Sequence, residues 1–212
     1  LFALALPRGS SSARAQPGDW RALWRVAAFP RAVAFGLLSH LFLQGPLAML
    51  PNLIAARGGS AGDVSWIWLA MLSLEVPLLL LSGVGIARIG ARGLLAVGML
   101  AGGLRFGLCG ARPDLFWVFA TAPLHGVTVA GLQIGLALHV EATVPARLRS
   151  TAQNALAAFG MGLGGMLSSL ATGALFEGQG AAAPYLLGGA GAVALALAVP
   201  LFVSRVRLTQ IR

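Results

Sequence analysis

The sequence predicts an all-α membrane protein built as a bundle of six transmembrane helices. Residues of the AVILMFWYC set make up 58% of the chain and charged residues only 10%, whereas a soluble domain usually carries about 25% charged residues. Six long apolar segments then follow one another, each close to the roughly 20 residues that a helix needs to cross the hydrocarbon core. The surface of this chain is therefore expected to face lipid.

The apolar segments lie at residues 31–55, 64–87, 93–110, 115–141, 150–176 and 184–204. Each is continuously apolar, whereas the strands of a membrane barrel alternate apolar and polar positions over roughly ten residues. Helices are predicted because they satisfy their own backbone hydrogen bonds within lipid. The third segment is the shortest.

The chain divides into four parts, of which the bundle at residues 31–204 is by far the largest. Residues 1–6 are apolar and suggest the end of a preceding transmembrane helix, so we expect an amino-terminally truncated fragment. Residues 7–30 have the composition of a cytoplasmic linker that ends in a short interfacial helix near residues 20–26. Residues 205–212 form a cytoplasmic tail.

Arginine is distributed unequally between the two sides of the predicted bundle. Cytoplasmic loops carry an excess of basic residues. The chain is therefore expected to be a multi-pass protein of the inner (plasma) membrane with both termini of the fragment in the cytoplasm. The other side holds only Arg57 and Arg112, whereas the cytoplasmic side holds Arg8, Arg14, Arg21, Arg25, Arg31, Arg88, Arg92, Arg147, Arg149, Arg205, Arg207 and Arg212.

Composition also excludes several classes of function. The net charge of +9 comes from arginines placed between apolar runs, without the clustered basic surface of a nucleic-acid-binding protein. The single cysteine, Cys109, excludes an internal disulfide and a cysteine-based metal site. No nucleotide-binding loop, metal-ligand cluster or nucleophile elbow occurs, so neither an enzyme nor a cofactor is predicted.

Three ionisable residues lie inside predicted spans, where a charge costs roughly 2.5 to 3.5 kcal/mol. Glu75 and His125 each lie about ten residues from the outer end of a span, a depth of about 15 Å, and Arg105 lies about 8 to 12 Å deep. Similar depths on three helices indicate a cluster. Its role is proton coupling or the binding of a polar or anionic substrate; a static ion pair between helices and the absence of any contact are the alternatives.

Other polar residues and interruptions of the predicted spans are weaker indications of a cavity. His40, Gln44 and Gln133 face either a cavity or a neighbouring helix. Gly160 and Gly164 form a small-xxx-small step that lets two helices pack closely or slide. The Gly45-Pro46 pair interrupts the first span, as in helices that line cavities, although proline is also common in membrane helices generally.

The connection between the second and third spans, residues 83–92 with the sequence GVGIARIGAR, resembles the cytoplasmic signature loop of the major facilitator superfamily. That signature places a glycine, an acidic residue, an arginine, a glycine and a basic residue at this spacing. Gly83, Arg88, Gly90 and Arg92 match it, and Ala87 replaces the usual acidic residue.

Further motifs resemble the phenylpropionate permease-like branch, which is distantly similar to lactose permease and nucleoside-proton symporters. They are residues 75–77 (EVP), 104–106 (LRF), 124–128 (LHGVT) and 144–153 (VPARLRSTAQ). In lactose permease a glutamate, an arginine and a histidine on the corresponding helices take part in sugar binding and proton coupling. The resemblance implies similar roles for Glu75, Arg105 and His125, but Thr128 replaces an acidic residue of that permease.

This resemblance implies that the chain is the carboxy-terminal six-helix half of a secondary active transporter, a proton-coupled permease for a small organic solute. A missing amino-terminal six-helix half would then supply the other wall of the substrate cavity. The expected partners are the lipid bilayer, that missing half, a small-molecule substrate and protons, and no nucleic acid. The alternative is a non-transporting membrane receptor or scaffold with the same fold.

Overall fold

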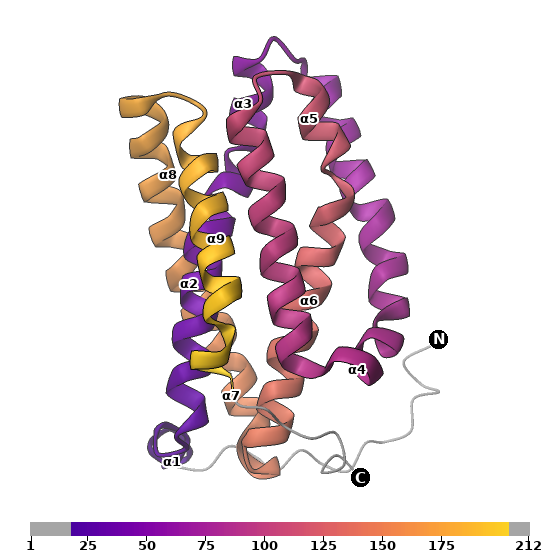
Figure 1. The fold of residues 1–212 in the computed structure, drawn as a ribbon. Helices are drawn as coiled ribbons and strands as arrows, with labels where there is room; N and C mark the ends of the chain where they lie inside the picture. The colour runs from indigo at the N-terminus through magenta and orange to yellow at the C-terminus, as the bar shows by residue number, and fades with distance from the viewer. Residues whose placement is uncertain (1–17, 204–212) are drawn as a thin grey trace, which may run out of the picture.

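The structure is a computed structural model that describes residues 18–203, apart from the side chains of Leu74 and of residues 80–88. The predicted tails at residues 1–6 and 205–212 lie outside this part, and the described part contains no strand. Its elements (Figure 1) are α1 (Asp19–Trp24), α2 (Ala28–Ala48), α3 (Leu50–Ala56), α4 (Ala61–Ala111), α5 (Leu115–Ala120), α6 (Pro123–Thr143), η2 (Ala146–Leu148), α7 (Arg149–Leu156), η3 (Ala157–Gly164), α8 (Gly165–Gln179) and α9 (Ala183–Phe202).

The predicted fold class is confirmed. Five helical stretches of the described chain are long and apolar enough to cross a membrane, and the bent pair α2 and α3 makes a sixth. The spans run up and down the bundle (Figure 1). After α2 and α3 they comprise residues 61–79, 89–111, 123–143, 146–179 and 183–202.

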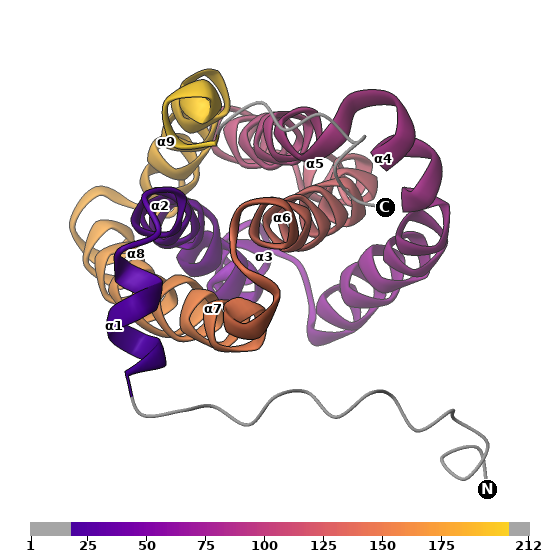
Figure 2. The same cartoon turned by 90° about the horizontal axis from the view of Figure 1, so that it is seen from below.

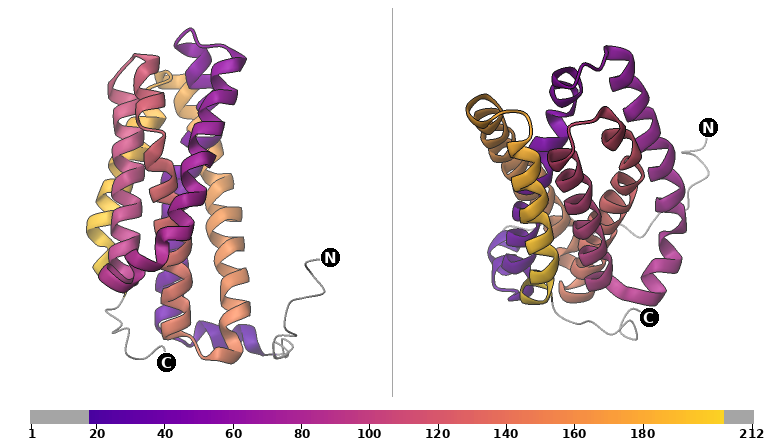
Figure 3. Two further views of the ribbon diagram at one scale, coloured as in Figure 1. Left: turned by 90° about the vertical axis from the view of Figure 1, so that its right-hand side faces the viewer. Right: turned by 45° about the horizontal axis from the view of Figure 1, so that its top comes forward.

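The long element α4 is a hairpin of two helices, not one rod. Gly90 has φ 64° and ψ −176°, a backbone conformation that glycine adopts without the steric penalty of a side chain. The chain reverses there, and Figure 3 shows the two arms running in opposite directions. We call residues 61–79 the first arm and residues 89–111 the second arm. One glycine of the predicted signature thus makes the turn between two spans.

The first span bends where α2 meets α3. The two helices meet at an angle of 44°, with Pro46 inside α2 and Met49 at the break. Ser168 of α8 enters the α2 backbone: its hydroxyl accepts from Gly45 N–H at 2.6 Å and donates to Leu41 C=O at 2.6 Å. It thus hydrogen-bonds to both backbone groups near the bend, and side chains of neighbouring helices are a recognised way of tolerating a break in a membrane helix.

Two further expected spans are interrupted. The segment predicted at 115–141 is divided into α5 and α6. Thr121 and Ala122 keep helical backbone angles, but Ala122, Leu124 and His125 donate to the carbonyl three residues back, which makes a tighter turn. The segment predicted at 150–176 contains a π-helix, η3, between α7 and α8. Hydropathy does not detect either feature, since both depend on backbone hydrogen bonding inside an unbroken apolar run.

The second arm of α4 packs between α6 and α9, and α2 packs against η3, α8 and α9. Seen along the bundle, the first arm lies at its edge (Figure 2). Only 12% of that span is buried, against 56% of the second arm. The core therefore lies among the other helices, and the first arm contacts it along one face.

Candidate functional site

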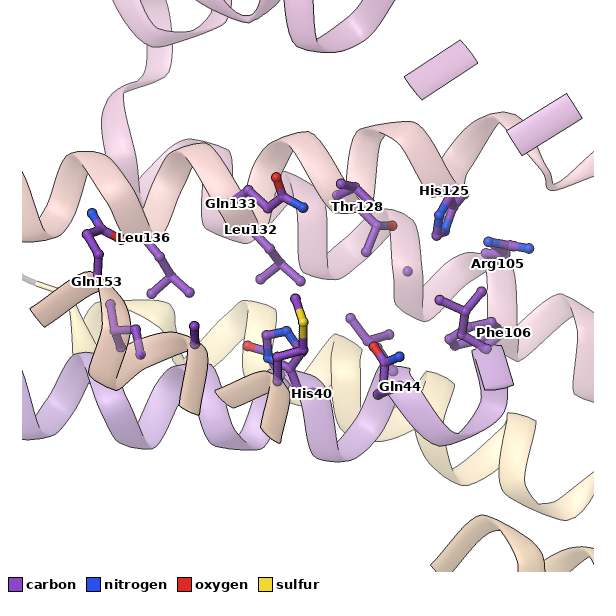
Figure 4. A pocket seen from close by; sticks show the side chains of 18 residues that line it. His40, Gln44, Arg105, Phe106, His125, Thr128, Leu132, Gln133, Leu136 and Gln153 are labelled. Carbon is purple, nitrogen blue, oxygen red and sulfur yellow. The ribbon is translucent and has the colours of Figure 1, made fainter. Parts of the chain in front are cut away.

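A cavity of about 290 Å³ lies between α2, the second arm of α4, α6, α7 and η3. Its wall is mainly apolar, with leucines on α2, α6 and α7. Polar side chains are spaced along it (Figure 4). They are Ser39, His40, Gln44, Arg105, His125, Thr128, Gln133 and Gln153.

His40 and Gln44 reach the cavity from α2, where a spacing of four residues places them on one helix face. The Nδ1 of His40 lies 2.8 Å from the Gly36 carbonyl oxygen. A carbonyl only accepts, so Nδ1 carries the proton in this bond and Nε2 is left as the second ring nitrogen. Ser39 donates to the Phe35 carbonyl at 2.7 Å.

On α6 the cavity side is set by helical periodicity. His125, Thr128 and Gln133 all line the wall, at spacings of three and five residues that keep them on one broad face. The Thr128 hydroxyl donates to the Leu124 carbonyl at 2.8 Å within its own helix. Thr128 therefore contributes no charge where the resemblance leads one to expect an acidic residue.

Glu75 and His125 form a close pair between the first arm of α4 and α6. Their Oε2 and Nε2 atoms are 3.7 Å apart, and the two side chains are 19% and 11% exposed. This distance is too long for a direct hydrogen bond but short enough for an ion pair when the imidazole is protonated. Glu75 itself does not line the cavity.

Gly126 explains how the first arm comes so near to α6. A Cβ atom at this position would lie 2.8 Å from Leu78 Cδ1, 3.0 Å from Glu75 Cα and 3.1 Å from Glu75 N. Only a residue without a side chain allows this approach. His125 and Gly126 are adjacent in the sequence. The close helix contact at Gly126 therefore brings Glu75 within reach of His125.

Arg105 is buried at one end of the cavity, beside His125 (Figure 4). Its Nη2 lies 2.7 Å from Met71 Sδ, and its Cζ lies 5.5 Å from the centre of the Phe106 ring. Nε and Nη1 are buried without a hydrogen-bond partner among the described side chains and backbone. The three ionic residues are therefore neighbours, but Arg105 and Glu75 do not form an ion pair.

Five of the predicted site residues line one cavity: His40, Gln44, Arg105, His125 and Gln133. Gln153 was not nominated from the sequence. The sequence places Gln153, Ala157 and Met161 on one helix face by their four-residue spacing, but only the structure shows that this face lines the cavity.

The signature-loop residues lie elsewhere. Gly90 makes the hairpin turn of α4, and Arg92 begins the second arm and is partly exposed. The surroundings of Gly83 and the side chain of Arg88 are outside the described part of the structure.

Comparison with known families now identifies the chain's relatives. The model of the MFS_1 like family matches residues 28–187. The chain belongs to this family of the major facilitator superfamily. The match runs from the start of α2 into α9, so it includes every residue that lines the cavity. With its membrane-spanning helices, the MFS_1 like chain is a multi-pass membrane protein.

Two curated proteins are similar to this MFS_1 like chain. The maltose permease of Geobacillus stearothermophilus is 30% identical over 155 residues, which are 71% of this chain and 39% of that protein. The uncharacterized transporter YwbF of Bacillus subtilis (strain 168) is 32% identical over 136 residues, 62% of this chain and 33% of that protein. The chain thus matches between a third and two fifths of the length of these relatives. No solved structure matches it.

Proposed function

We propose that the chain is one six-helix half of a proton-coupled permease for a small organic solute. The observation that carries this proposal is a membrane-embedded cavity with Arg105 and His125 at one end and with Glu75 within 3.7 Å of His125. Polar groups at this depth in a membrane bundle typically belong to substrate or ion pathways. Family membership favours transport over enzymatic catalysis.

In the proposed mechanism Glu75 gains and loses a proton as the cavity faces alternate sides of the membrane. A protonated His125 holds the Glu75 carboxylate in an ion pair. When Glu75 itself binds a proton, it loses its charge and the ion pair breaks. The first arm carries Glu75 and is the least buried of the six spans. Movement of this arm therefore breaks fewer core contacts than movement of the second arm would.

The other wall of the cavity is proposed to come from an amino-terminal six-helix half, with this chain as the carboxy-terminal one. Sites of the superfamily lie near midplane between such halves. The chain matches only 39% and 33% of the length of its two relatives, and this supports the proposal of a second half. So does the resemblance to the phenylpropionate permease-like and lactose permease-like branch.

The arginine distribution supports a plasma-membrane orientation with α1 and the α6–α7 connection in the cytoplasm. Arg57 and Arg112 lie at one end of the bundle, where Arg57 donates to the carbonyls of Cys109 and Asp114. The α6–α7 connection, to which Arg147 and Arg149 belong, lies at the other end, as do α1 and the turn of α4 (Figure 1). Under the positive-inside rule the arginine-rich end faces the cytoplasm.

The test is uptake by the full-length protein in proteoliposomes, with radiolabelled sugars, nucleosides and carboxylates and an imposed pH gradient. Glu75→Gln is expected to abolish accumulation while leaving downhill exchange, because the glutamine cannot carry the proton. Glu177→Gln is the control, since Glu177 is exposed at the end of α8. Unchanged accumulation by Glu75→Gln contradicts the coupling role; no uptake of any solute favours a receptor or scaffold.

A further inference from the structure

The cavity has one permanent cation and no carboxylate among the residues that line it. Arg105 supplies the positive charge, and His40 and His125 can add to it when protonated. The remaining polar groups are three glutamine amides and two hydroxyls. Glu75 lies within 3.7 Å of His125 but outside the wall.

The charge of Arg105 is not compensated within the described part of the protein. A guanidinium group stays protonated in proteins and offers five N–H donors, yet its only hydrogen bond in the described part of the protein goes to a thioether sulfur, and the Phe106 ring lies beside it. Arg105 is 1% exposed, so bulk solvent screens this charge little. An unpaired buried charge of this kind is strongly unfavourable, and it becomes favourable when an anion binds beside it.

We propose that the substrate is a small organic anion, with its oxyanion group at the Arg105 end of the cavity. This inference rests on the proposed function of the cavity as a substrate site, and it names the class of that substrate. Arginine is suited to the task because its planar donors match the two oxygens of a carboxylate. The carboxylate would occupy the donors that Nε and Nη1 now leave unpaired.

The rest of the wall fits an apolar body better than a polyhydroxylated one. Between Arg105 and Gln153 the lining is dominated by leucines, among them Leu132, Leu136 and Leu156. Hydroxyl groups placed against these leucines would lose their hydrogen bonds to water without replacement. An organic anion with a hydrocarbon body satisfies both the charged end and the apolar part of the wall, whereas a neutral disaccharide leaves the charge of Arg105 unpaired.

The experiment compares matched acids and amides by equilibrium binding to the full-length protein in nanodiscs of phosphatidylcholine. The probes are benzoate with benzamide, hexanoate with hexanamide, maltose and inorganic phosphate. At least one carboxylate is expected to bind about tenfold tighter than its amide, because only the acid forms charged hydrogen bonds with Arg105. This comparison uses the wild-type chain and does not depend on the folding of any variant.

Variants then assign the preference to Arg105. Arg105→Gln is expected to abolish the difference between acid and amide, and Arg105→Lys to retain part of it. Arg112→Gln is the matched control, because Arg112 is exposed outside the cavity. Loss of carboxylate binding in Arg112→Gln contradicts the proposal.

Several other results would overturn it: equal binding of acid and amide, no binding of any carboxylate, binding of maltose that Arg105→Gln leaves unchanged, or phosphate binding as tight as that of the organic acids. Binding is measured without a gradient, so it is independent of transport. Carboxylate binding without uptake would refute the proposed permease and leave this inference intact. Uptake of neutral solutes by a chain that binds no carboxylate would refute this inference and leave the proposed permease intact.

Discussion

At the scale of single residues, the absence of a side chain at Gly126 is as important to the proposed site as the ionisable groups. The contact of Gly126 with the backbone of Glu75 sets the separation between the first arm of α4 and α6. Glu75 reaches His125 at 3.7 Å across this contact. A methyl group there would displace the carboxylate without altering either ionisable residue.

Gly126→Ala is therefore expected to uncouple accumulation from the proton gradient, as Glu75→Gln does, while both ionisable groups remain. Overpacking should also lower the stability of the bundle by about 1 to 3 kcal/mol. The measurement is gradient-driven uptake in proteoliposomes, together with thermal unfolding. Gly107→Ala is the control, because a Cβ there meets no atom within 4 Å. Normal accumulation by Gly126→Ala would show that this contact does not position Glu75.

The sequence predicted which residues lie at similar depth but not which of them pair. Counting along a helix gives depth at about 1.5 Å per residue, and on this basis Glu75, Arg105 and His125 were expected to meet. Pairing also depends on how each helix is rotated about its axis. The structure brings Glu75 to His125 and turns Arg105 toward Met71 instead, and spacing within one helix does not contain that information.

At the scale of elements, the π-helix η3 lies against α2 at the centre of the cavity wall. Ala157 and Met161 of η3 line the cavity, and two of its glycines, Gly160 and Gly164, face α2. A Cβ at Gly160 would lie 3.2 Å from His40 Nδ1, and one at Gly164 would lie 2.7 Å from the Leu37 carbonyl oxygen. The small-xxx-small step expected from the sequence thus packs two helices closely, and it does so beside a polar residue of the cavity.

Gly164→Ala is expected to lower the stability of the bundle by about 1 to 3 kcal/mol, because the added methyl group meets the backbone of α2. Gly162→Ala in the same π-helix is the matched control. Gly162 is exposed, and the nearest atom to its added Cβ would be the Ala157 carbonyl oxygen at 3.8 Å, an ordinary contact. Unfolding of the two variants in detergent gives the comparison. Equal stabilities would mean that η3 and α2 move apart to accommodate the added methyl group at Gly164 without a loss of stability.

Helix α1 also joins this part of the bundle. Trp20 stacks on Phe159 of η3 with ring centres 6.1 Å apart, and Trp24 meets the same ring edge-on at 6.0 Å. Asp19, which is 4% exposed, forms an ion pair with Arg147. The predicted helix near residues 20–26 is present, but its attachment to η3 was not predictable, because nothing in the local pattern of the linker identifies Phe159 as its contact.

At the scale of the whole molecule, the order and approximate positions of the six spans followed from hydropathy alone. The break at Met49 was expected from the Gly45-Pro46 pair, whereas the break at Thr121 was not, because apolar content continues through it. The uneven burial of the two α4 arms was also not predictable. It reflects which helices neighbour one another in the bundle, and both arms have the composition of lipid-facing spans.

The orientation of the bundle leads to a labelling prediction with an internal control. Cys109 is the chain's single cysteine and is fully buried, so Cys109→Ala removes the one thiol of this chain, and the same protein without a new cysteine gives the background labelling. Gln179 and Ala146 are both exposed, and they lie at opposite ends of the bundle, at the α8–α9 and α6–α7 connections (Figure 1). In that background we expect a membrane-impermeant maleimide to label Gln179→Cys in intact cells.

Ala146→Cys should be labelled only after permeabilisation, because it lies at the arginine-rich end that the positive-inside rule places in the cytoplasm. Each variant controls for the reactivity and expression of the other, since both carry one exposed thiol in the same protein. The reverse pattern would invert the bundle and, with it, the side from which Arg105 and His125 are approached. Labelling of both variants in intact cells would mean that the two ends do not lie on opposite sides of one membrane.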